Sequence, residues 1–353
     1  MPKEYQVFNQ RAAKELLDRH HKALKALRKI EVELNRRFFG MQEPIRALVL
    51  SVLAREPLLL VGDPGTGKSK LIREFCKCVG VDPDATTQED YFEYLLTQFT
   101  EPSELFGFFD IGALVGPKRG ATVLKRMDTG MMQNAKVIYL DEVFNASSAI
   151  LNTLLAFMNE RKFHDRGERT KVDWFCLMGA SNRVPDSGQS ELRALYDRFF
   201  LRCHVSNVLE LEPNAHDHAM RIGNLLTMGW KLTYTRDGLS GSMQLLSDLD
   251  LLRADIETHE KLFEPADDFV KQLTRVALGL GNSKQHLSNR RLVKLMDLML
   301  LNRLYEAANE PRPPDALLVR GGSEFGREFS LLCYMLERQD AKSLFDAKAN
   351  LDG

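Results

Sequence analysis

Short apolar runs alternate with amphipathic stretches between about residues 57 and 205. The runs are short and continuous enough to predict buried strands at 58–61, 136–140, 174–180 and 199–205, with a fainter fifth strand at about 91–98. The stretches between them have apolar residues at helical intervals. Strands that alternate with helices predict a parallel sheet covered by helices, so this region is expected to be an α/β domain.

The segments on either side of this region have helical patterns. Residues 10–37 are rich in helix formers and predict one or two amphipathic helices. Composition changes after Val208, and residues 209–305 predict a second, all-helical domain. A Pro-rich connector at 308–318 precedes a last helical pattern at 324–345. We therefore predict four parts: an N-terminal helical segment (1–36), the α/β domain (37–208), the helical domain (209–307), and a connector with a C-terminal helix packed on the helical domain (308–353).

Composition and charge narrow the class of protein only slightly. The chain has 353 residues and a formal net charge of −1, which gives no indication of binding to nucleic acid or to an anionic membrane. Its apolar runs are shorter than the roughly 18 residues of a membrane span, and its N-terminus lacks an apolar signal region. Five scattered cysteines are typical of reduced thiols. We expect a cytoplasmic protein without membrane insertion.

A glycine-rich segment, VGDPGTGKSK (61–70), directly follows the first predicted strand. It satisfies the Walker A pattern, in which glycines let several backbone N–H groups face one anion. Lys68 would neutralise the β- and γ-phosphates, and the Ser69 hydroxyl would bind Mg²⁺. The strand, loop and helix that this motif requires follow one another here. The predicted nucleotide-binding residues are Gly62, Asp63, Pro64, Gly65, Thr66, Gly67, Lys68 and Ser69.

Two adjacent carboxylates end the next predicted strand, in KVIYLDEVFN (136–145). Asp141 stands where the carboxyl end of a strand would meet Mg²⁺, and Glu142 could act as a general base on the attacking water. In isolation the same pattern fits a strand that ends in solvated acids. A Glu beside the Walker B Asp favours an ATPase over a small-molecule kinase, because the acceptor of a kinase is not water.

Polar and basic residues follow the third predicted strand. Asn182 ends the strand and could contact the γ-phosphate and orient water, or could simply form a turn. Near the next helix-to-strand junction lie Arg193, Arg198 and Arg202. One of these could neutralise transition-state charge in a neighbouring subunit, as an arginine finger does. Arg198, held between aromatic residues in YDRFF, is the most constrained, whereas Arg193 and Arg202 are interpreted first as surface charges.

Two further arginines begin the predicted helix in HLSNRRLVKLMDLML (286–300). Ser288 or Asn289 can cap this helix. Arg290 and Arg291 then fall in its first turn, where the helix dipole disfavours cations. A nearby anion would offset this unfavourable interaction and explain why two arginines stand there.

Together these motifs resemble AAA+ ATPases of the MoxR family, and within that family the regulatory-ATPase-variant (RavA-type) branch. The resemblance covers about residues 30–335. It is carried by GDPGTGKS (62–69), YLLTQFTEPSELFG (94–107), VIYLDEVFNASSAILNTLLAFMNERKF (137–163), GASNRVP (179–185), ELRALYDRFFLR (191–202) and LSNRRL (287–292).

The resemblance implies an AAA+ core with hairpin insertions and an all-helical lid, ATP and Mg²⁺ as cofactors, and a homo-oligomeric ring of six subunits. It also implies roles for individual residues. Asp141 and Glu142 would form Walker B, and Asn182 would be sensor 1. Arg198 would be the arginine finger. Arg290 would be the sensor 2 arginine, although Arg291 is adjacent and the assignment is uncertain by one residue.

Two segments are similar to the family's hairpins, which face the central channel of a ring: residues 104–130, the helix-2 insertion, and 161–173, the hairpin before sensor 1. The family implies a chaperone-like ATPase that remodels or matures a protein partner, commonly one with a von Willebrand factor A domain. The alternative is a nucleic-acid motor, which basic hairpins would suit; the near-neutral chain disfavours it. The hairpin cations are Lys118, Arg119, Lys125, Arg126, Arg161, Lys162, Arg166, Arg169 and Lys171.

Overall fold

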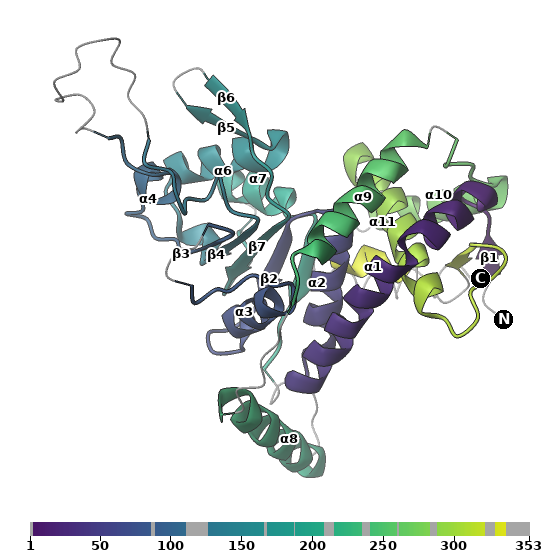
Figure 1. The fold of residues 1–353 in the computed structure, drawn as a ribbon, viewed down its shortest axis with the longest axis horizontal. Helices are drawn as coiled ribbons and strands as arrows, with labels where there is room; N and C mark the ends of the chain where they lie inside the picture. Colours follow the sequence, from purple (N-terminus) through teal and green to yellow (C-terminus); the bar gives the residue numbers. More distant parts are fainter. Residues whose placement is uncertain are drawn as a thin grey trace.

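The structure is a computed structural model of the chain. It describes residues 3–85, 89–110, 126–165, 168–186, 188–207, 215–234, 241–259, 261–282, 288–321 and 329–336. Figure 1 shows an α/β part beside a group of helices, with the long helix α1 running between them.

Five parallel strands form the centre of the α/β part, in the order β3–β4–β7–β2–β8. Their bounds are β2 (Leu58–Val61), β3 (Tyr91–Leu95), β4 (Val137–Asp141), β7 (Cys176–Ser181) and β8 (Leu201–His204). The five predicted strands and the α/β fold class are thereby confirmed, with strand ends shifted by a few residues. Because β7 lies between β2 and β4, the strand that leads into the phosphate loop is not adjacent to the strand that carries Asp141.

The side chains of β2 explain why helices cover both faces of the sheet. Leu58 and Leu60 belong to one apolar core, whereas Leu59 and Val61 belong to the other. Successive side chains of a strand point to opposite faces, so a strand that is apolar throughout must be covered twice. The helices of this part are α2 (Gln42–Ala54), α3 (Lys68–Cys78), α4 (Pro102–Phe106), α6 (Ser148–Glu160) and α7 (Ser190–Arg198), with a 3-10 turn η1 (Val143–Asn145).

The remaining described helices are α1 (Gln10–Arg37), α8 (Ala215–Tyr234), α9 (Gln244–Thr258), α10 (Asp267–Asn282) and α11 (Asn289–Asn309). The N-terminal stretch forms one continuous helix, whose first turn is capped by the Asn9 side chain accepting a hydrogen bond from the Ala12 N–H at 3.1 Å. α1 contacts α9 and α11 as well as α2 and α3, so it joins the helical group to the sheet. The four predicted domain boundaries stay a prediction.

The chain ends contribute small elements. β1 (Lys3–Tyr5) pairs antiparallel with β9 (Val319–Gly321), which places two segments from opposite ends of the sequence side by side. The helical pattern predicted at 324–345 falls mostly outside the described residues. Its described part contains a 3-10 turn, η3 (Phe329–Tyr334), that packs on α11 and β8. Among the described helices, none is both long and apolar enough to cross a membrane.

The hairpin predicted at 161–173 is confirmed. β5 (Lys162–Asp165) and β6 (Glu168–Lys171) pair antiparallel and project beyond α6 (Figure 1). The insertion predicted at 104–130 is described only at its base, where Phe109 and Arg126 form an antiparallel bridge. Lys118, Arg119, Lys125 and Arg166 lie outside the described residues. A place for either hairpin in a channel stays a prediction.

Arg161, grouped above with the hairpin's surface cations, instead anchors the base of the hairpin. Its backbone is left-handed (φ 49°) between α6 and β5, and its guanidinium lies 3.7 Å from the centre of the Trp174 ring. The guanidinium donates hydrogen bonds to the carbonyl oxygens of Trp174 (3.1 Å) and Arg55 (2.5 Å). Burial, followed by the nearby Arg55, lowers the pKa of Arg161 to about 10.

We predict that Arg161→Ala destabilises the protein by about 2–4 kcal/mol, because the Arg55 carbonyl oxygen loses its side-chain donor, the Trp174 carbonyl oxygen keeps only the donor from Arg55, and the Trp174 ring loses its stacked cation. Equilibrium denaturation in urea measures this loss. Arg169→Ala, on the exposed strand of the same hairpin, is the matched control and should change stability by less than about 0.5 kcal/mol. Equal effects of the two changes would contradict an anchoring role.

Candidate nucleotide-binding site

The glycine-rich loop connects β2 to α3 at the carboxyl edge of the sheet. Gly62 approaches β8 so closely that a Cβ atom there would lie 2.2 Å from the Val205 carbonyl oxygen, so no larger residue fits without movement. Gly67 has φ 89° and forms the N-cap of α3. The loop therefore curls into the positive end of that helix, an arrangement that binds anions.

Lys68 reaches back across the loop from the first turn of α3. Its ammonium group donates hydrogen bonds to the carbonyl oxygens of Gly62 (2.6 Å) and Asp63 (2.9 Å), and the residue is buried. Burial lowers the pKa of Lys68, and the negative charges of Asp141 and Glu142 partly offset this effect. The charge of Lys68 is thus held beside the Walker B carboxylates.

Ser69 contacts a residue of the Asp141 strand that the motifs did not single out. The Ser69 hydroxyl lies 2.9 Å from the hydroxyl of Tyr139, on β4. Burial raises the pKa of Tyr139, and the carboxylate of Asp141, two residues further along the strand, raises it further. A hydroxyl and a carboxylate held together are hard oxygen ligands of the kind that Mg²⁺ takes alongside phosphate oxygens. Among the described residues, no cluster of three or more His, Cys, Asp or Glu could hold a metal on its own.

Glu142 occupies a strained position just beyond β4. Its backbone is left-handed (φ 52°, ψ 46°), a conformation that is uncommon for residues other than glycine and is found at functional sites. One carboxylate oxygen accepts a hydrogen bond from the Asn182 side-chain amide at 2.5 Å, and the other accepts one from Asn145 at 3.4 Å. Asn182 follows β7 directly, so the two neighbouring strands bring their end residues together.

The surroundings of Glu142 favour its protonated form more than water does. Burial is the largest cause of its raised pKa, and the adjacent Asp141 is the second; Lys68 and the hydrogen bonds from Asn182 oppose them. A carboxylate with a raised pKa is a better proton acceptor, which is what a general base requires.

A cavity of about 410 Å³ opens beside the phosphate loop. One wall is the turn between α1 and α2, at Phe38–Met41, and the opposite wall is formed by Leu225, Met228 and Leu232 of α8. Gly65, Thr66 and Gly67 lie at its polar end. The apolar walls and polar end suit a ligand that joins a flat ring to phosphates.

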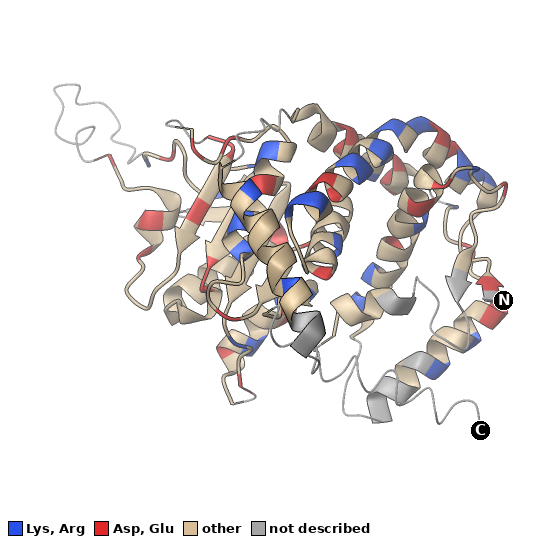
Figure 2. Cartoon of the chain, turned by 90° about the horizontal axis from the view of Figure 1, so that it is seen from below, with Lys and Arg blue, Asp and Glu red and all other residues tan. Residues whose placement is uncertain are grey.

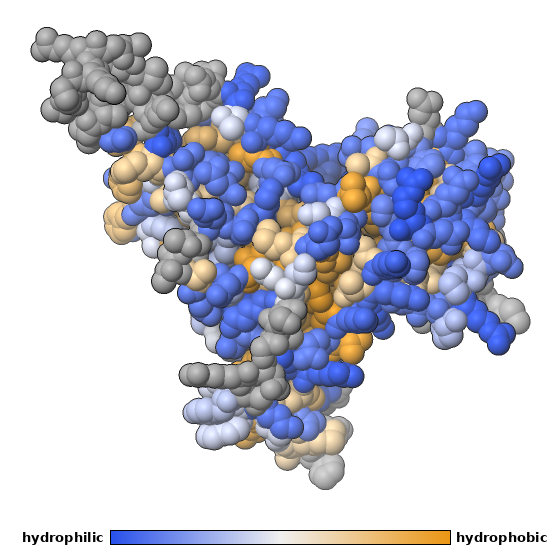
Figure 3. Space-filling model, viewed as in Figure 1, coloured by the Kyte–Doolittle hydropathy of each residue, from blue (hydrophilic) through white to orange (hydrophobic). Residues whose placement is uncertain are grey.

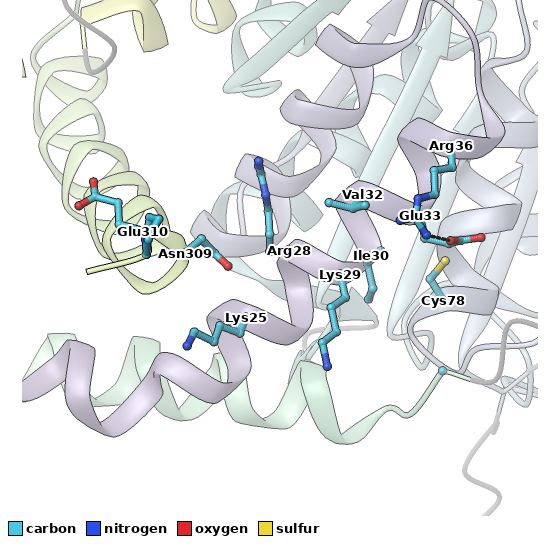
Figure 4. Close-up of a pocket in the computed structure, with 12 residues that line it drawn as sticks. Lys25, Arg28, Lys29, Ile30, Val32, Glu33, Arg36, Cys78, Asn309 and Glu310 are labelled. Carbon is cyan, nitrogen blue, oxygen red and sulfur yellow. Dashed lines mark ion pairs between the residues drawn. The ribbon is translucent and has the colours of Figure 1, made fainter. Parts of the chain in front are cut away.

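A larger cavity, of about 760 Å³, lies against α1 and shares no lining residue with the phosphate loop. Figure 4 shows Lys25, Arg28 and Lys29 of α1 among the residues that line it. Cys78 also lines this cavity, and burial raises its pKa to about 12, so its thiol is not a nucleophile at neutral pH. Of the residues that the motifs predict for nucleotide binding, Pro64, Gly65, Thr66 and Gly67 line the smaller cavity.

Arg198 lies at the other edge of the sheet from the phosphate loop. It ends α7, and β8 then starts at Leu201, which pairs with Leu58, the first residue of β2. The loop follows the last residue of β2, about 13 Å further along at roughly 3.3 Å per residue. The structure therefore brings Lys68, Asp141, Glu142 and Asn182 together but leaves Arg198 apart from them. The Arg198 Nε is buried and has no hydrogen-bond partner among the described residues.

The other arginines have different surroundings. Arg202 is buried and donates hydrogen bonds to the carbonyl oxygens of Phe199 and Tyr196, so it is not the surface charge considered above. Arg193 donates a long hydrogen bond to the Pro185 carbonyl oxygen (3.4 Å).

At the start of α11, Arg291 is buried and forms an ion pair with Asp197 at 2.8 Å, whereas Arg290 is exposed and donates a hydrogen bond to the Asn159 side chain at 3.4 Å. Asp197 of the same chain is thus the anion beside Arg291. The Ser288 side chain caps α11, as predicted.

Comparison with known proteins identifies the family. Residues 25–253, more than half of the chain, match the model of the MoxR domain found in MoxR–vWA–beta-propeller ternary systems. The chain belongs to the MoxR family.

Curated relatives of this MoxR-family protein carry little functional information. Two uncharacterized proteins of Methanocaldococcus jannaschii are each 39% identical over 186 residues, which is 53% of this chain and 45% or 46% of theirs. A structural protein of the Acidianus two-tailed virus is 33% identical over 176 residues, 50% of this chain and 27% of its own length. The chain thus spans less than half the length of the curated relatives it matches.

The fold has a solved counterpart. The crystal structure of a candidate ATPase from Cytophaga hutchinsonii is similar with a TM-score of 0.58 and covers 96% of this chain and 97% of its own. At 15% identity this likeness concerns the fold alone. It agrees with the AAA+ fold class predicted from the sequence.

Three features of the site were missed by motif reasoning. Tyr139 could have been noticed as a phenol within an otherwise aliphatic strand, VIYLD, and Asn145 as a second amide beside the Walker B acids. The cavity walls at Phe38–Met41 and α8 carry no motif, and only the tertiary structure brings them to the loop.

We predict that Asn182→Ala raises the pKa of Glu142 further, because the lost amide hydrogen bond stabilises the carboxylate form. The Glu142 carboxyl carbon, assigned by comparison with Glu142→Gln, can be titrated by NMR in the two proteins. The midpoint should move to higher pH in Asn182→Ala. An unchanged or lower midpoint would show that the amide does not bond to this carboxylate in solution.

Proposed function

We propose that this MoxR-family protein binds ATP with Mg²⁺ and hydrolyses it. Gly62–Ser69 would hold the phosphates, and Ser69 and Asp141 would hold Mg²⁺. Glu142 would accept a proton from the water that attacks the γ-phosphorus atom, while the bond from phosphorus to the bridging oxygen breaks and ADP leaves. Asn182 would orient Glu142 and the water.

One observation carries this proposal. Glu142 is held by Asn182 and Asn145 in a left-handed conformation, beside Asp141 and within the field of Lys68. A carboxyl group that served only to solvate the end of a strand would gain nothing from backbone strain and two amide partners. A raised pKa and fixed orientation are what a base for water requires.

We further propose that the active assembly is a ring of identical subunits, six by family expectation. Arg198 would complete the site of the neighbouring subunit as its arginine finger. The position of Arg198 at the opposite edge of its own sheet supports action across a subunit boundary. Exposed Arg290, tied to the same edge through the Arg291–Asp197 pair, would act as sensor 2 on that neighbour.

ATP hydrolysis would drive remodelling or maturation of a protein partner, and a von Willebrand factor A domain protein is the expected one. The description of the matched family, which names MoxR–vWA systems, supports this choice. Assignment to the RavA-type branch rests on the sequence motifs. Five free cysteines, four of them buried, support a cytoplasmic location.

The second candidate function is a nucleic-acid motor, and two observations weigh against it. Arg161 and Arg126, counted above as hairpin cations, lie over the rings of Trp174 and Phe109. Basic and acidic residues are also interspersed along the described chain (Figure 2). Binding of single- and double-stranded DNA at increasing salt distinguishes the two functions, since phosphate contacts give a steep salt dependence.

We predict that Glu142→Gln keeps ATP affinity within a few-fold of wild type and lowers hydrolysis by at least about 10²-fold, because the phosphate cradle and Asp141 remain while the base is lost. Nucleotide binding and phosphate release are measured together. Glu160→Gln, a change of the same kind at an exposed position on α6, is the matched control and should hydrolyse normally. Turnover by Glu142→Gln at half the wild-type rate would remove Glu142 from the base role.

We predict that Arg198→Ala lowers hydrolysis by about 10³–10⁵-fold, as removal of a finger does in related phosphoryl transfer. Mixing Arg198→Ala subunits with Glu142→Gln subunits should restore part of the activity, because some interfaces then pair an intact Glu142 with an intact Arg198.

The control mixture is Glu142→Gln with Lys68→Ala. Lys68 and Glu142 act in the same subunit's nucleotide site. Every site in the mixed ring therefore lacks one of them, and no activity should return. Lack of rescue in rings shown to contain both Arg198→Ala and Glu142→Gln subunits would argue that Arg198 does not act in trans.

A further inference from the structure

A tyrosine is buried in the middle of the Walker B strand. Tyr139 is the third residue of β4, VIYLD, and it is fully buried, at 0% exposure. The other apolar residues of this strand are aliphatic. An aliphatic side chain or a phenylalanine would pack there as well, because a buried hydroxyl costs free energy unless it is hydrogen-bonded. The hydroxyl of Tyr139 therefore calls for an explanation beyond core packing.

The hydrogen-bond partner of this hydroxyl is Ser69, in the first turn of α3. The two hydroxyl oxygens lie 2.9 Å apart. α3 is amphipathic: Leu71 and Phe75 belong to the same apolar core as Tyr139, and Figure 3 shows hydrophilic atoms on the visible side of this helix. The apolar side of α3 thus packs over β4, which is separated from β2 by β7. The contact between Ser69 and Tyr139 joins the end of the phosphate loop directly to the Walker B strand.

The chemistry of a serine hydroxyl explains why such a contact matters for a metal ligand. The group has one hydrogen and two lone pairs. It can present a lone pair to a cation only when its hydrogen points elsewhere, and the Tyr139 oxygen can accept that hydrogen. The other proposed ligand is also held from within the chain, since Asp141 Oδ1 accepts a hydrogen bond from the Glu142 N–H at 3.0 Å.

Asp141 favours this direction of the hydrogen bond. Alternation along β4 directs Tyr139 and Asp141 to the same face of the sheet. The negative charge of Asp141 acts on the Tyr139 phenol, as does burial, and both raise its pKa, so the phenol keeps its proton at neutral pH. A nearby carboxylate attracts the phenol hydrogen, which leaves the phenol oxygen to accept from Ser69.

We propose that Tyr139 is a positioning residue for Mg²⁺, and that it acts by accepting the Ser69 hydrogen. The proposal rests on the proposed function, in which Ser69 and Asp141 hold the metal. With its hydrogen bonded to Tyr139, the Ser69 oxygen has both lone pairs left for other partners. Phenylalanine at position 139 would leave the Ser69 hydroxyl free to rotate and to turn its hydrogen toward the cation.

The test measures how much Mg²⁺ the protein needs, independently of turnover. The affinity for a non-hydrolysable ATP analogue is determined by calorimetry in EDTA and at increasing free Mg²⁺, and the midpoint of the increase in affinity reports the binding of the metal. Tyr139→Phe removes one oxygen atom and keeps the ring. It should need about three- to tenfold more Mg²⁺, the effect of losing one neutral hydrogen bond. Its circular dichroism and its affinity for the analogue in EDTA should match wild type.

Tyr91→Phe is the matched control. Tyr91 is equally buried, in the neighbouring strand β3, but its hydroxyl donates a hydrogen bond to Glu93 at 2.9 Å. This variant should keep the wild-type Mg²⁺ requirement. A second comparison uses Ser69→Ala. If Tyr139 acts through Ser69, adding Tyr139→Phe to Ser69→Ala should change the Mg²⁺ requirement by less than about twofold.

Four results would overturn the inference and leave ATP binding as proposed: a Mg²⁺ requirement of Tyr139→Phe equal to wild type, an equal increase in Tyr91→Phe, an effect of Tyr139→Phe that is as large in the Ser69→Ala background, or a Tyr139→Phe affinity that falls equally in EDTA. The wild-type chain tests the proposed function itself. Equal affinity for the analogue with and without Mg²⁺ would refute the metal site together with the inference, and no binding of the analogue would refute the proposed function as a whole.

Discussion

The parallel register of β4, β7 and β2 is the constraint on which the site depends. Because the strands run in the same direction, their carboxyl ends meet at one edge, and the residues just beyond them are brought within hydrogen-bonding distance. Glu142 and Asn182, 40 positions apart in the chain, meet for this reason. The insertion of β7 between β2 and β4 is equally necessary. It places the Asn182 side chain, which directly follows β7, between the phosphate loop and the Walker B acids.

At the opposite edge of the sheet, ion pairs join the strands to the group of helices. Lys294 of α11 pairs with Glu56, just before β2, and Arg55 joins Asp250 of α9 to Asp173, just before β7. These pairs fix the helical group against the amino ends of the strands, which is also where Arg198 and Arg290 lie. The phosphate loop with Glu142 and the proposed finger Arg198 therefore lie at opposite edges of one sheet. The proposed closed ring would let identical subunits combine the two, each pairing its phosphate loop with the Arg198 of its neighbour.

Sequence patterns predict correctly those features that depend on neighbouring residues, such as the strands and the glycine loop. The apolar runs gave the five strands, and the glycine spacing of the phosphate loop has its geometric reason in the 2.2 Å approach at Gly62. Arg161 shows where such reasoning stops. Its position among charged hairpin residues suggests a solvated cation, yet Trp174, 13 positions later, offers a ring and a carbonyl that bury it. Tyr139 and the cavity wall of α8 were missed for the same reason, since their partners are distant in sequence. The sequence does not decide whether Arg290 or Arg291 corresponds to the sensor 2 arginine. In the structure Arg291 is buried and Arg290 is exposed.

The hydrogen bond between Asn182 and Glu142 raises a question about the proposed base, because a carboxylate that is already bonded could be unable to take a proton. A carboxylate oxygen has two lone pairs, so the oxygen that accepts from Asn182 can also accept from a water molecule. The amide bond stabilises the charged form, and burial beside Asp141 destabilises it. The balance leaves the pKa raised but keeps the carboxylate oriented. Strain in the Glu142 backbone, of order 1–3 kcal/mol, is then the local cost of that orientation, and a glycine that relieved it would remove the base itself.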